Sequence, residues 1–149
     1  AQSTFISSTY WTERIGPTAA LKMLEIHQRD NVSDHLVRMG TKVQKGWTSL
    51  AEKNQLSIDV GGIPPLSHFS FNTGDSNAVK ALFIQLMLER GFLASNSFYS
   101  MFSHTDEHLD VYLKSVDSSF ITIKQALDQD NVNPLLKGKP SVSGFKRLT

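Results

Sequence analysis

Two short stretches in the middle of the chain alternate between apolar and polar side chains, and they restrict the fold more than any other feature. Residues 56–60 and residues 66–71 both repeat with a period of two, which is typical of a strand with one buried face. The Gly- and Pro-containing segment between them breaks the chain. Because the two stretches are close in sequence, antiparallel pairing is the simplest connection. The sequence therefore predicts a β-hairpin.

Two helical patterns precede this hairpin. The first has Thr12 as a candidate N-cap and Pro17 in its early turns, where proline is tolerated, so we place its proper start near Pro17. Ser33 is the expected N-cap of a second, longer helix that ends near residues 53–54. The apolar stripe of the second helix recurs at steps of three and four, with two glycines that weaken the helix: Leu36, Met39, Val43, Trp47 and Leu50, with Gly40 and Gly46.

Two further helical patterns follow the hairpin. A third helix is expected after the turn at residues 72–75, with Gly91 as its C-cap. Residues 92–94 and 98–102 have the character of short extended segments. Thr105 and the acidic residues after it open a last helix. The apolar stripe of this last helix is the clearest in the chain and consists of Leu109, Tyr112, Leu113, Val116, Phe120, Ile123 and Leu127.

This order of elements is typical of an α+β fold, because the strands are bunched between helices and do not alternate with them along the whole chain. We expect a small antiparallel sheet of three to four short strands covered on one side by helices. Residues 130–149 are rich in Pro, Gly and Asn and are expected to form a loop-like tail.

Composition excludes several classes of function. The chain has 149 residues, of which 40% are hydrophobic and 19% charged, as in a globular domain. The net charge of +1 and the scattered basic residues give no reason to expect nucleic acid or an anionic membrane as a partner. The lack of cysteine excludes disulfides, thiolate catalysis and Cys-type zinc sites, and it is compatible with a cytoplasmic location. We expect neither a membrane span nor a signal peptide.

Two places carry side chains that suit a binding site. His104 and His108 are four residues apart, but a helix that starts at Thr105 leaves His104 outside it, so we expect a capped helix and no metal site. Ser8 and Thr9 belong to a run of hydroxyls just before a helix, where a phosphate can bind. Composition alone favours an ordinary Ser/Thr-rich loop at this second place.

Two segments resemble those of a known enzyme family. In class III (fold type I) pyridoxal-phosphate aminotransferases and glutamate-1-semialdehyde aminomutases, a Thr-aromatic pair precedes an alanine-rich helix, and FISSTYWTERIGPTAALKMLE is similar, with Thr9 and Tyr10 as the pair. ERGFLASNSFYSMFSHTDEHLD resembles the family's late segment, which leads to a His-Thr-Asp-Glu helix start. The two motifs stand in the family's order and separation, and the resemblance spans about residues 5–127.

The resemblance implies that the chain is the small, C-terminal domain of such an enzyme. Residues 1–11 would continue from a missing N-terminal large domain, and residues 12–129 would form the small domain. The intact enzyme would hold pyridoxal 5'-phosphate (PLP), form a homodimer, and transfer or migrate an amino group between a small-molecule donor and acceptor. Thr9, with Ser8 as a weaker neighbour, would bind the cofactor phosphate of the neighbouring subunit.

The lysine that this chemistry requires is expected upstream of Ala1, because the family carries its Schiff-base lysine in the large domain. Lys22 falls in the alanine-rich helix, and Lys42, Lys45 and Lys80 are explained as solvent-face charges on amphipathic helices. We therefore assign no catalytic residue and expect the 149-residue piece to be inactive on its own.

Two departures from the family pattern bear on the reaction. Residues 11–17 replace a short family turn, which indicates an altered pocket wall and a different substrate. Tyr99 stands where aminomutases often carry an acidic residue, which favours an aminotransferase over an aminomutase. A hypothesis of another class is a stand-alone interaction or regulatory module that kept the fold without catalysis.

Overall fold

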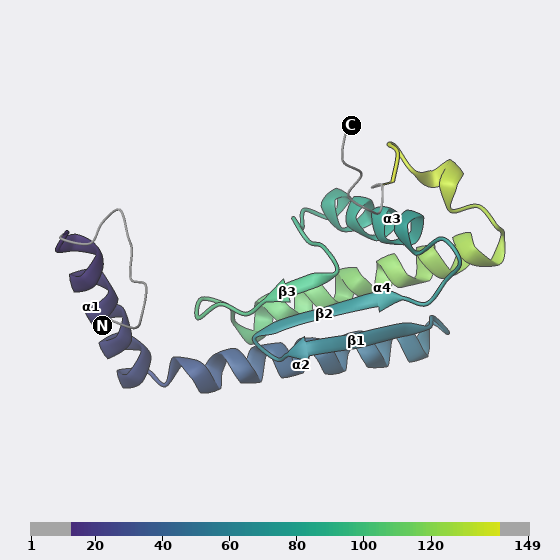
Figure 1. Cartoon of the computed structure of the whole chain (residues 1–149). Helices are drawn as coiled ribbons and strands as arrows, with labels where there is room; N and C mark the ends of the chain where they lie inside the picture. The colour runs from purple at the N-terminus through teal and green to yellow at the C-terminus, as the bar shows by residue number, and fades with distance from the viewer. Residues whose placement is uncertain (1–12, 141–149) are drawn as a thin grey trace, which may run out of the picture. The chain divides into compact units, whose positions relative to one another are not determined.

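The computed structural model describes residues 13–140, and its contacts divide the chain into two compact units, residues 1–35 and 36–149. Helix α1 (Ile15–Arg29) belongs to the first unit (Figure 1). The carboxylate of Glu13 accepts the backbone N–H groups of Ile15 and Gly16 at 2.6 and 3.0 Å, so it satisfies donors at the start of the helix. Thr12, the predicted cap, lies outside the described residues. No residue of α1 is buried.

Helix α2 (Val32–Lys53) begins one residue before Ser33, so the prediction of Ser33 as its N-cap is wrong. Asn31 precedes the helix with a φ of 49°, a left-handed conformation that asparagine adopts more readily than most residues. The Asn31 amide also donates a hydrogen bond to Asp34 at 2.6 Å. The stripe of α2 that is buried in the second unit consists of Met39, Val43, Trp47 and Ala51, with Leu50 partly buried.

Strands β1 (Ile58–Ile63) and β2 (Leu66–Phe71) form the predicted antiparallel hairpin, in which Val60 lies opposite Phe69. The first strand was expected at residues 56–60, but it continues through Gly61 and Gly62, where a break was expected. Strand β2 buries Ser67, Phe69 and Phe71 and exposes the residues between them, so its period of two corresponds to one buried face.

Strand β3 (Ser97–Tyr99) pairs antiparallel with β2 and completes a sheet with the order β1-β2-β3. Three strands lie within the predicted range. Residues 92–94 were expected to be extended but form no strand. The reason lies at the end of helix α3 (Ser76–Glu89), where Gly91 has a φ of 84° and the Phe92 N–H bonds back to the Met87 carbonyl at 2.9 Å.

Three helices cover one face of the sheet, as predicted for the α+β fold (Figure 1). The rings of Trp47 from α2, Phe83 from α3 and Phe120 from helix α4 (Asp106–Asp128) surround Phe69 of β2. Their centroids lie 4.8, 5.2 and 6.0 Å from that of Phe69, in edge-to-face geometry. One aromatic cluster therefore joins the sheet to all three helices of the second unit.

Two glycines of α2 lie where the helix closely approaches its neighbours. A Cβ atom at Gly40 would lie 1.6 Å from the carbonyl oxygen of Pro64, in the turn between β1 and β2. A Cβ atom at Gly46 would lie 2.6 Å from the side chain of Leu113 on α4. We expected these glycines only to weaken the helix, but they also permit its packing against the hairpin and α4.

Part of the expected tail is structured. Val132 is buried in the core, and a short 3₁₀ helix, η1, follows at Asn133–Leu135. The side-chain amide of Gln85 donates to the Leu135 carbonyl at 3.0 Å and accepts the Lys137 N–H at 2.8 Å. These contacts attach the segment after α4 to α3. Within residues 13–140, no helix is long and apolar enough to cross a bilayer.

Candidate functional site

The two predicted cofactor-binding residues, Ser8 and Thr9, lie outside the described residues, so their role stays a prediction. The second segment of the family resemblance, residues 89–110, is described throughout. This segment builds most of the candidate site.

The candidate site is an apolar groove of about 780 Å³. One wall comes from the irregular segment after α3 together with β3, and the other comes from the first turns of α4. The groove is lined by Phe92, Leu93, Ala94, Ser97, Phe98, Tyr99, Met101, Ser103, His104, Glu107, His108, Leu109, Val111 and Tyr112.

Two histidines hold the backbone between β3 and α4. Nδ1 of His104 accepts the Met101 N–H at 3.1 Å, and the His104 ring stacks on Phe98 with centroids 5.1 Å apart. Nδ1 of His108 accepts the Thr105 N–H at 3.2 Å, while the Thr105 hydroxyl accepts the His108 N–H at 3.3 Å. This is a capping box in which histidine takes the place usually held by Glu or Gln.

The predicted cap at Thr105 is therefore confirmed, and the structure adds the role of His108. Both Nδ1 atoms are engaged with backbone N–H groups of this segment, which leaves them unsuited to share a metal. Within the described part of the chain, no group of three or more His, Asp or Glu residues could hold a metal ion.

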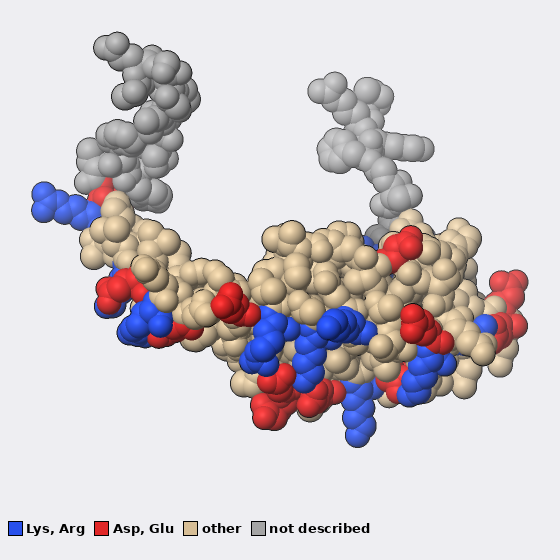
Figure 2. Space-filling view, turned by 90° about the horizontal axis from the view of Figure 1, so that it is seen from below, with Lys and Arg blue, Asp and Glu red and all other residues tan. Residues whose placement is uncertain are grey.

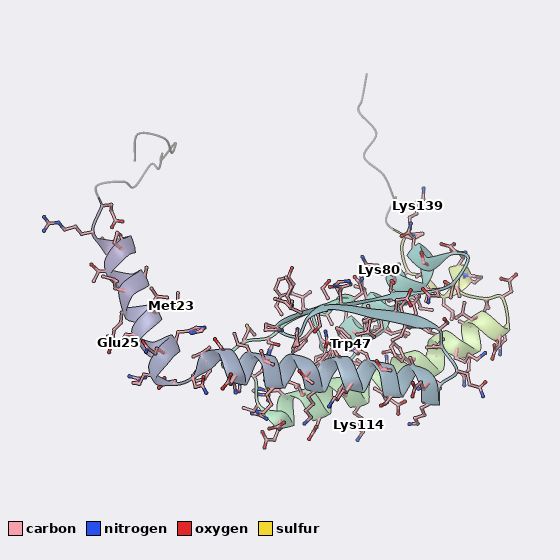
Figure 3. The ribbon with its side chains drawn as sticks, turned by 60° about the horizontal axis from the view of Figure 1, so that its bottom comes forward. Met23, Glu25, Trp47, Lys80, Lys114 and Lys139 are labelled. Atoms are coloured by element: carbon pink, nitrogen blue, oxygen red, sulfur yellow. The ribbon has the colours of Figure 1, made fainter. Side chains whose placement is uncertain are left out.

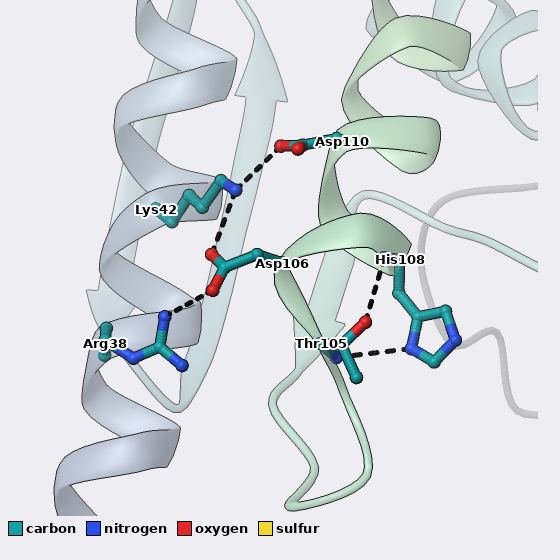
Figure 4. A network of polar contacts seen from close by, with 6 residues as sticks. All are labelled: Arg38, Lys42, Thr105, Asp106, His108 and Asp110. Atoms are coloured by element: carbon teal, nitrogen blue, oxygen red, sulfur yellow. Dashed lines mark hydrogen bonds and ion pairs between the residues drawn. The ribbon is translucent and has the colours of Figure 1, made fainter.

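A network of ion pairs joins the start of α4 to α2 (Figure 4). Asp106 lies 2.8 Å from a guanidinium nitrogen of Arg38 and 3.0 Å from Nζ of Lys42. The same Lys42 nitrogen lies 2.7 Å from Asp110. Hydrogen bonds from Arg38, and to a smaller extent from Lys42, hold the pKa of Asp106 below its usual range. The hydrogen bonds that Lys42 donates to Asp110 and Asp106 raise the pKa of Lys42.

The second unit has a face of mixed charge. Figure 2 shows Lys and Arg side chains beside Asp and Glu side chains over the second unit, with neither sign dominating the view. Such a face is typical of a solvated surface and offers no basic stripe for nucleic acid. The groove differs from this face because neither Lys nor Arg lines it, and Glu107 is its acidic residue.

The described residues do not fit the reactive part of a PLP site. Lys42 and Lys53 pair with aspartates, and Figure 3 shows Lys114 and Lys139 pointing outward. Lys45 lines a shallow hollow of about 500 Å³ beside β1 but is exposed. An anchoring lysine must be desolvated and close to the substrate, and a phosphate needs convergent donors. The lysines named here are exposed or paired with aspartates, and neither Lys nor Arg lines the groove.

The comparisons with known proteins agree with the family resemblance. No protein-family profile matches the chain. It is 26% identical over 132 residues to 3-aminobutyryl-CoA aminotransferase of Cloacimonas acidaminovorans. This match covers 85% of this chain and 32% of the relative. It is 29% identical over 107 residues to 2'-deamino-2'-hydroxyneamine transaminase of Streptomyces kanamyceticus. This second match covers 72% of this chain and 27% of that relative. A glutamate-1-semialdehyde 2,1-aminomutase of Clostridium perfringens is 28% identical over 110 residues.

A solved structure shares the fold. The FumI protein of Sphingopyxis sp. MTA144, in its PLP internal aldimine form, superposes with a TM-score of 0.73 at 15% identity. The match covers 85% of this chain and 31% of that protein.

Together these findings confirm the resemblance to class III PLP-dependent aminotransferases and aminomutases. The chain spans about a third or less of the length of the curated relatives it matches. The matched stretch is one part of these longer relatives, which agrees with the expectation of a C-terminal fragment.

Proposed function

We propose that the chain is the small, C-terminal domain of a PLP-dependent aminotransferase or aminomutase and does not catalyse by itself. The observation that carries this proposal is the coincidence of two matches. The sequence match and the fold match each cover 85% of this chain, and each covers only about a third of a longer protein. A domain that forms about a third of a longer enzyme accounts for both the high coverage of this chain and the low coverage of the longer proteins.

In this proposal the missing N-terminal large domain supplies the lysine and most of the cofactor site. PLP, when bound there, would provide the electron sink for amino-group transfer. Thr9, helped by Ser8, would donate hydrogen bonds to the cofactor phosphate of the other subunit in a cytoplasmic homodimer. The groove between β3 and α4 would close one side of the substrate pocket and exclude water from it.

Helix α1 carries apolar side chains that a large domain would cover in this proposal. Ile15 is 80% exposed, Leu21 is 70% exposed and Leu24 is 57% exposed, although all three are apolar. A helix with no buried residue and several large apolar side chains requires a partner surface to be stable in water. The large domain is the partner that the proposal supplies.

One feature favours an aminotransferase over an aminomutase within this proposal. Tyr99 lines the groove at the position where aminomutases often carry an acid. The identities of the amino donor and acceptor belong to the intact enzyme.

Covalent labelling tests the proposed division of labour. The 149-residue chain is mixed with PLP, reduced with borohydride and digested, and its peptides are weighed by mass spectrometry. We expect weak labelling spread over exposed lysines, whereas the complete product of the reading frame should be labelled at one lysine outside this chain. Saturable labelling of a single lysine among these 149 residues, lost when that lysine is replaced by alanine, would contradict the proposal.

A further inference from the structure

The groove between β3 and α4 combines an apolar lining with one sign of charge. Aromatic and aliphatic side chains dominate it, neither Lys nor Arg lines it, and Glu107 projects from the first turn of α4. A hydrogen bond from the Thr105 hydroxyl holds the pKa of Glu107 below its usual range, so this carboxylate is ionised at neutral pH. The groove therefore presents a negative charge beside an apolar surface.

An anionic ligand finds no Lys or Arg in the lining to pair with its charge. The start of a helix usually attracts anions through its free N–H groups. At α4, His108 accepts the Thr105 N–H and Thr105 accepts the His108 N–H. The Met101 N–H is bonded to His104 in the same way. These internal acceptors occupy donors that a carboxylate or phosphate would otherwise use, and Glu107 repels such a group.

A cationic ligand with an apolar body meets the opposite conditions. Glu107 offers charge complementarity to an ammonium group. Leu93 and Val111 are 98% and 58% exposed, so the rim presents apolar surface that a ligand can cover. The volume of about 780 Å³ lies in the range of small-molecule sites, roughly 300–1,000 Å³.

We propose that this groove binds primary amines with an apolar body, the ammonium group beside Glu107 and the body between β3 and Val111. This inference rests on the proposed function in one respect, since an aminotransferase takes an amine as its amino donor. It deepens that function by naming the substrate class: an apolar amine in preference to a dicarboxylic or phosphorylated compound.

Three ligands of equal length test the inference on the 149-residue chain, which carries the whole groove. Hexylamine, hexanol and hexanoate are titrated at one ionic strength and followed by ¹H–¹⁵N correlation spectra. We expect hexylamine to give saturable shifts in residues 92–111, hexanol to bind more weakly at the same place, and hexanoate to bind weakest. Glu107→Gln should weaken hexylamine about two- to fivefold and leave hexanol unchanged.

Helix α4 offers a matched pair of variants. Val111→Lys places a cation in the groove, one helical turn after Glu107 and able to pair with it, and should weaken hexylamine about fivefold or more. Ile121→Lys makes a similar change at another exposed apolar position of α4 that does not line the groove, and should have no effect. Circular dichroism confirms that both variants fold.

Equal affinity for hexanoate and hexylamine would overturn the inference, and so would shifts outside the groove or an equal effect of the two lysine variants. No cofactor is used in these titrations. A result for or against the amine site is therefore independent of the PLP labelling that tests the proposed function.

Discussion

The indole Nε1 of Trp47 donates a hydrogen bond to the hydroxyl of Tyr112 at 3.1 Å, between α2 and α4. Both side chains are buried, and Tyr112 also lines the groove, so this bond joins the core to the candidate site. Burial is also the main reason that the pKa of the Tyr112 phenol is raised.

Removal of the Tyr112 hydroxyl should destabilise the fold, although the substitution removes only one oxygen atom. Tyr112→Phe leaves the Trp47 N–H buried without its acceptor, which costs about 1–3 kcal/mol in the free energy of unfolding. Urea denaturation followed by circular dichroism measures the change. Tyr99→Phe, at an exposed position, is the control and should alter stability by less than about 0.5 kcal/mol. Equal effects of the two substitutions would contradict the role of the bond.

The two glycines of α2 should respond differently to alanine. Alanine raises helix propensity by about 1 kcal/mol at either position. At Gly40 the new methyl group meets the backbone of Pro64, which cannot rotate away, so we expect a net loss of about 2 kcal/mol. At Gly46 it meets only the ends of the Leu113 side chain, which can change rotamer, so the net change should stay within about 1 kcal/mol. Thermal and urea unfolding of both variants compare the two costs, and a Gly40→Ala protein as stable as the parent would refute the close approach.

The Asp106 network predicts a loss of stability in acid. Because Arg38 and Lys42 lower the pKa of Asp106 in the folded state, its contribution is present above the pKa of the unfolded state, 3.8, and is lost as the pH falls through the folded value. Asp106→Asn should therefore flatten the fall in urea midpoint below about pH 4. Because the network is solvent-exposed, salt should reduce the effect. Asp59→Asn, on the exposed side of β1, is the control, and an equal flattening there would count against the network.

The histidine in the capping box allows a conservative replacement. His108→Gln keeps an acceptor that can reach the Thr105 N–H, whereas His108→Ala removes it. We expect the alanine variant to lose about 0.5–1.5 kcal/mol and the glutamine variant to lose less than half of that. Native-state hydrogen exchange at Thr105 should speed up only in the alanine variant. Identical exchange in both variants would show that the imidazole does not hold this amide.

Periodicity was sufficient to predict much of the fold. The alternation in residues 66–71 corresponds to the buried Phe69 and Phe71, and five of the seven stripe residues of α4 are buried, with Leu113 and Leu127 partly buried. These elements were predictable because each buries one face, and burial leaves a period in the sequence. The start of α2 was missed because the left-handed conformation of Asn31 moved the helix start ahead of Ser33.

The candidate site was harder to predict because it has no period. Met101 and Tyr99 come from irregular or very short extended segments, and they meet Val111 only through the tertiary fold. The roles of Gly40 and Gly46 also depend on what lies across from them, which one sequence does not reveal. Residues 92–94 and 98–102 were interpreted only as short extended segments, so their part in lining a groove was not predicted.

The coding sequence upstream of residue 1 tests the central claim most directly. The account predicts several hundred codons in frame that encode a large domain with a PLP-anchoring lysine, in agreement with relatives of which this chain covers 26–32%. A reading frame that opens immediately before Ala1 with its own initiating Met would contradict it. That result would favour the stand-alone interaction or regulatory module.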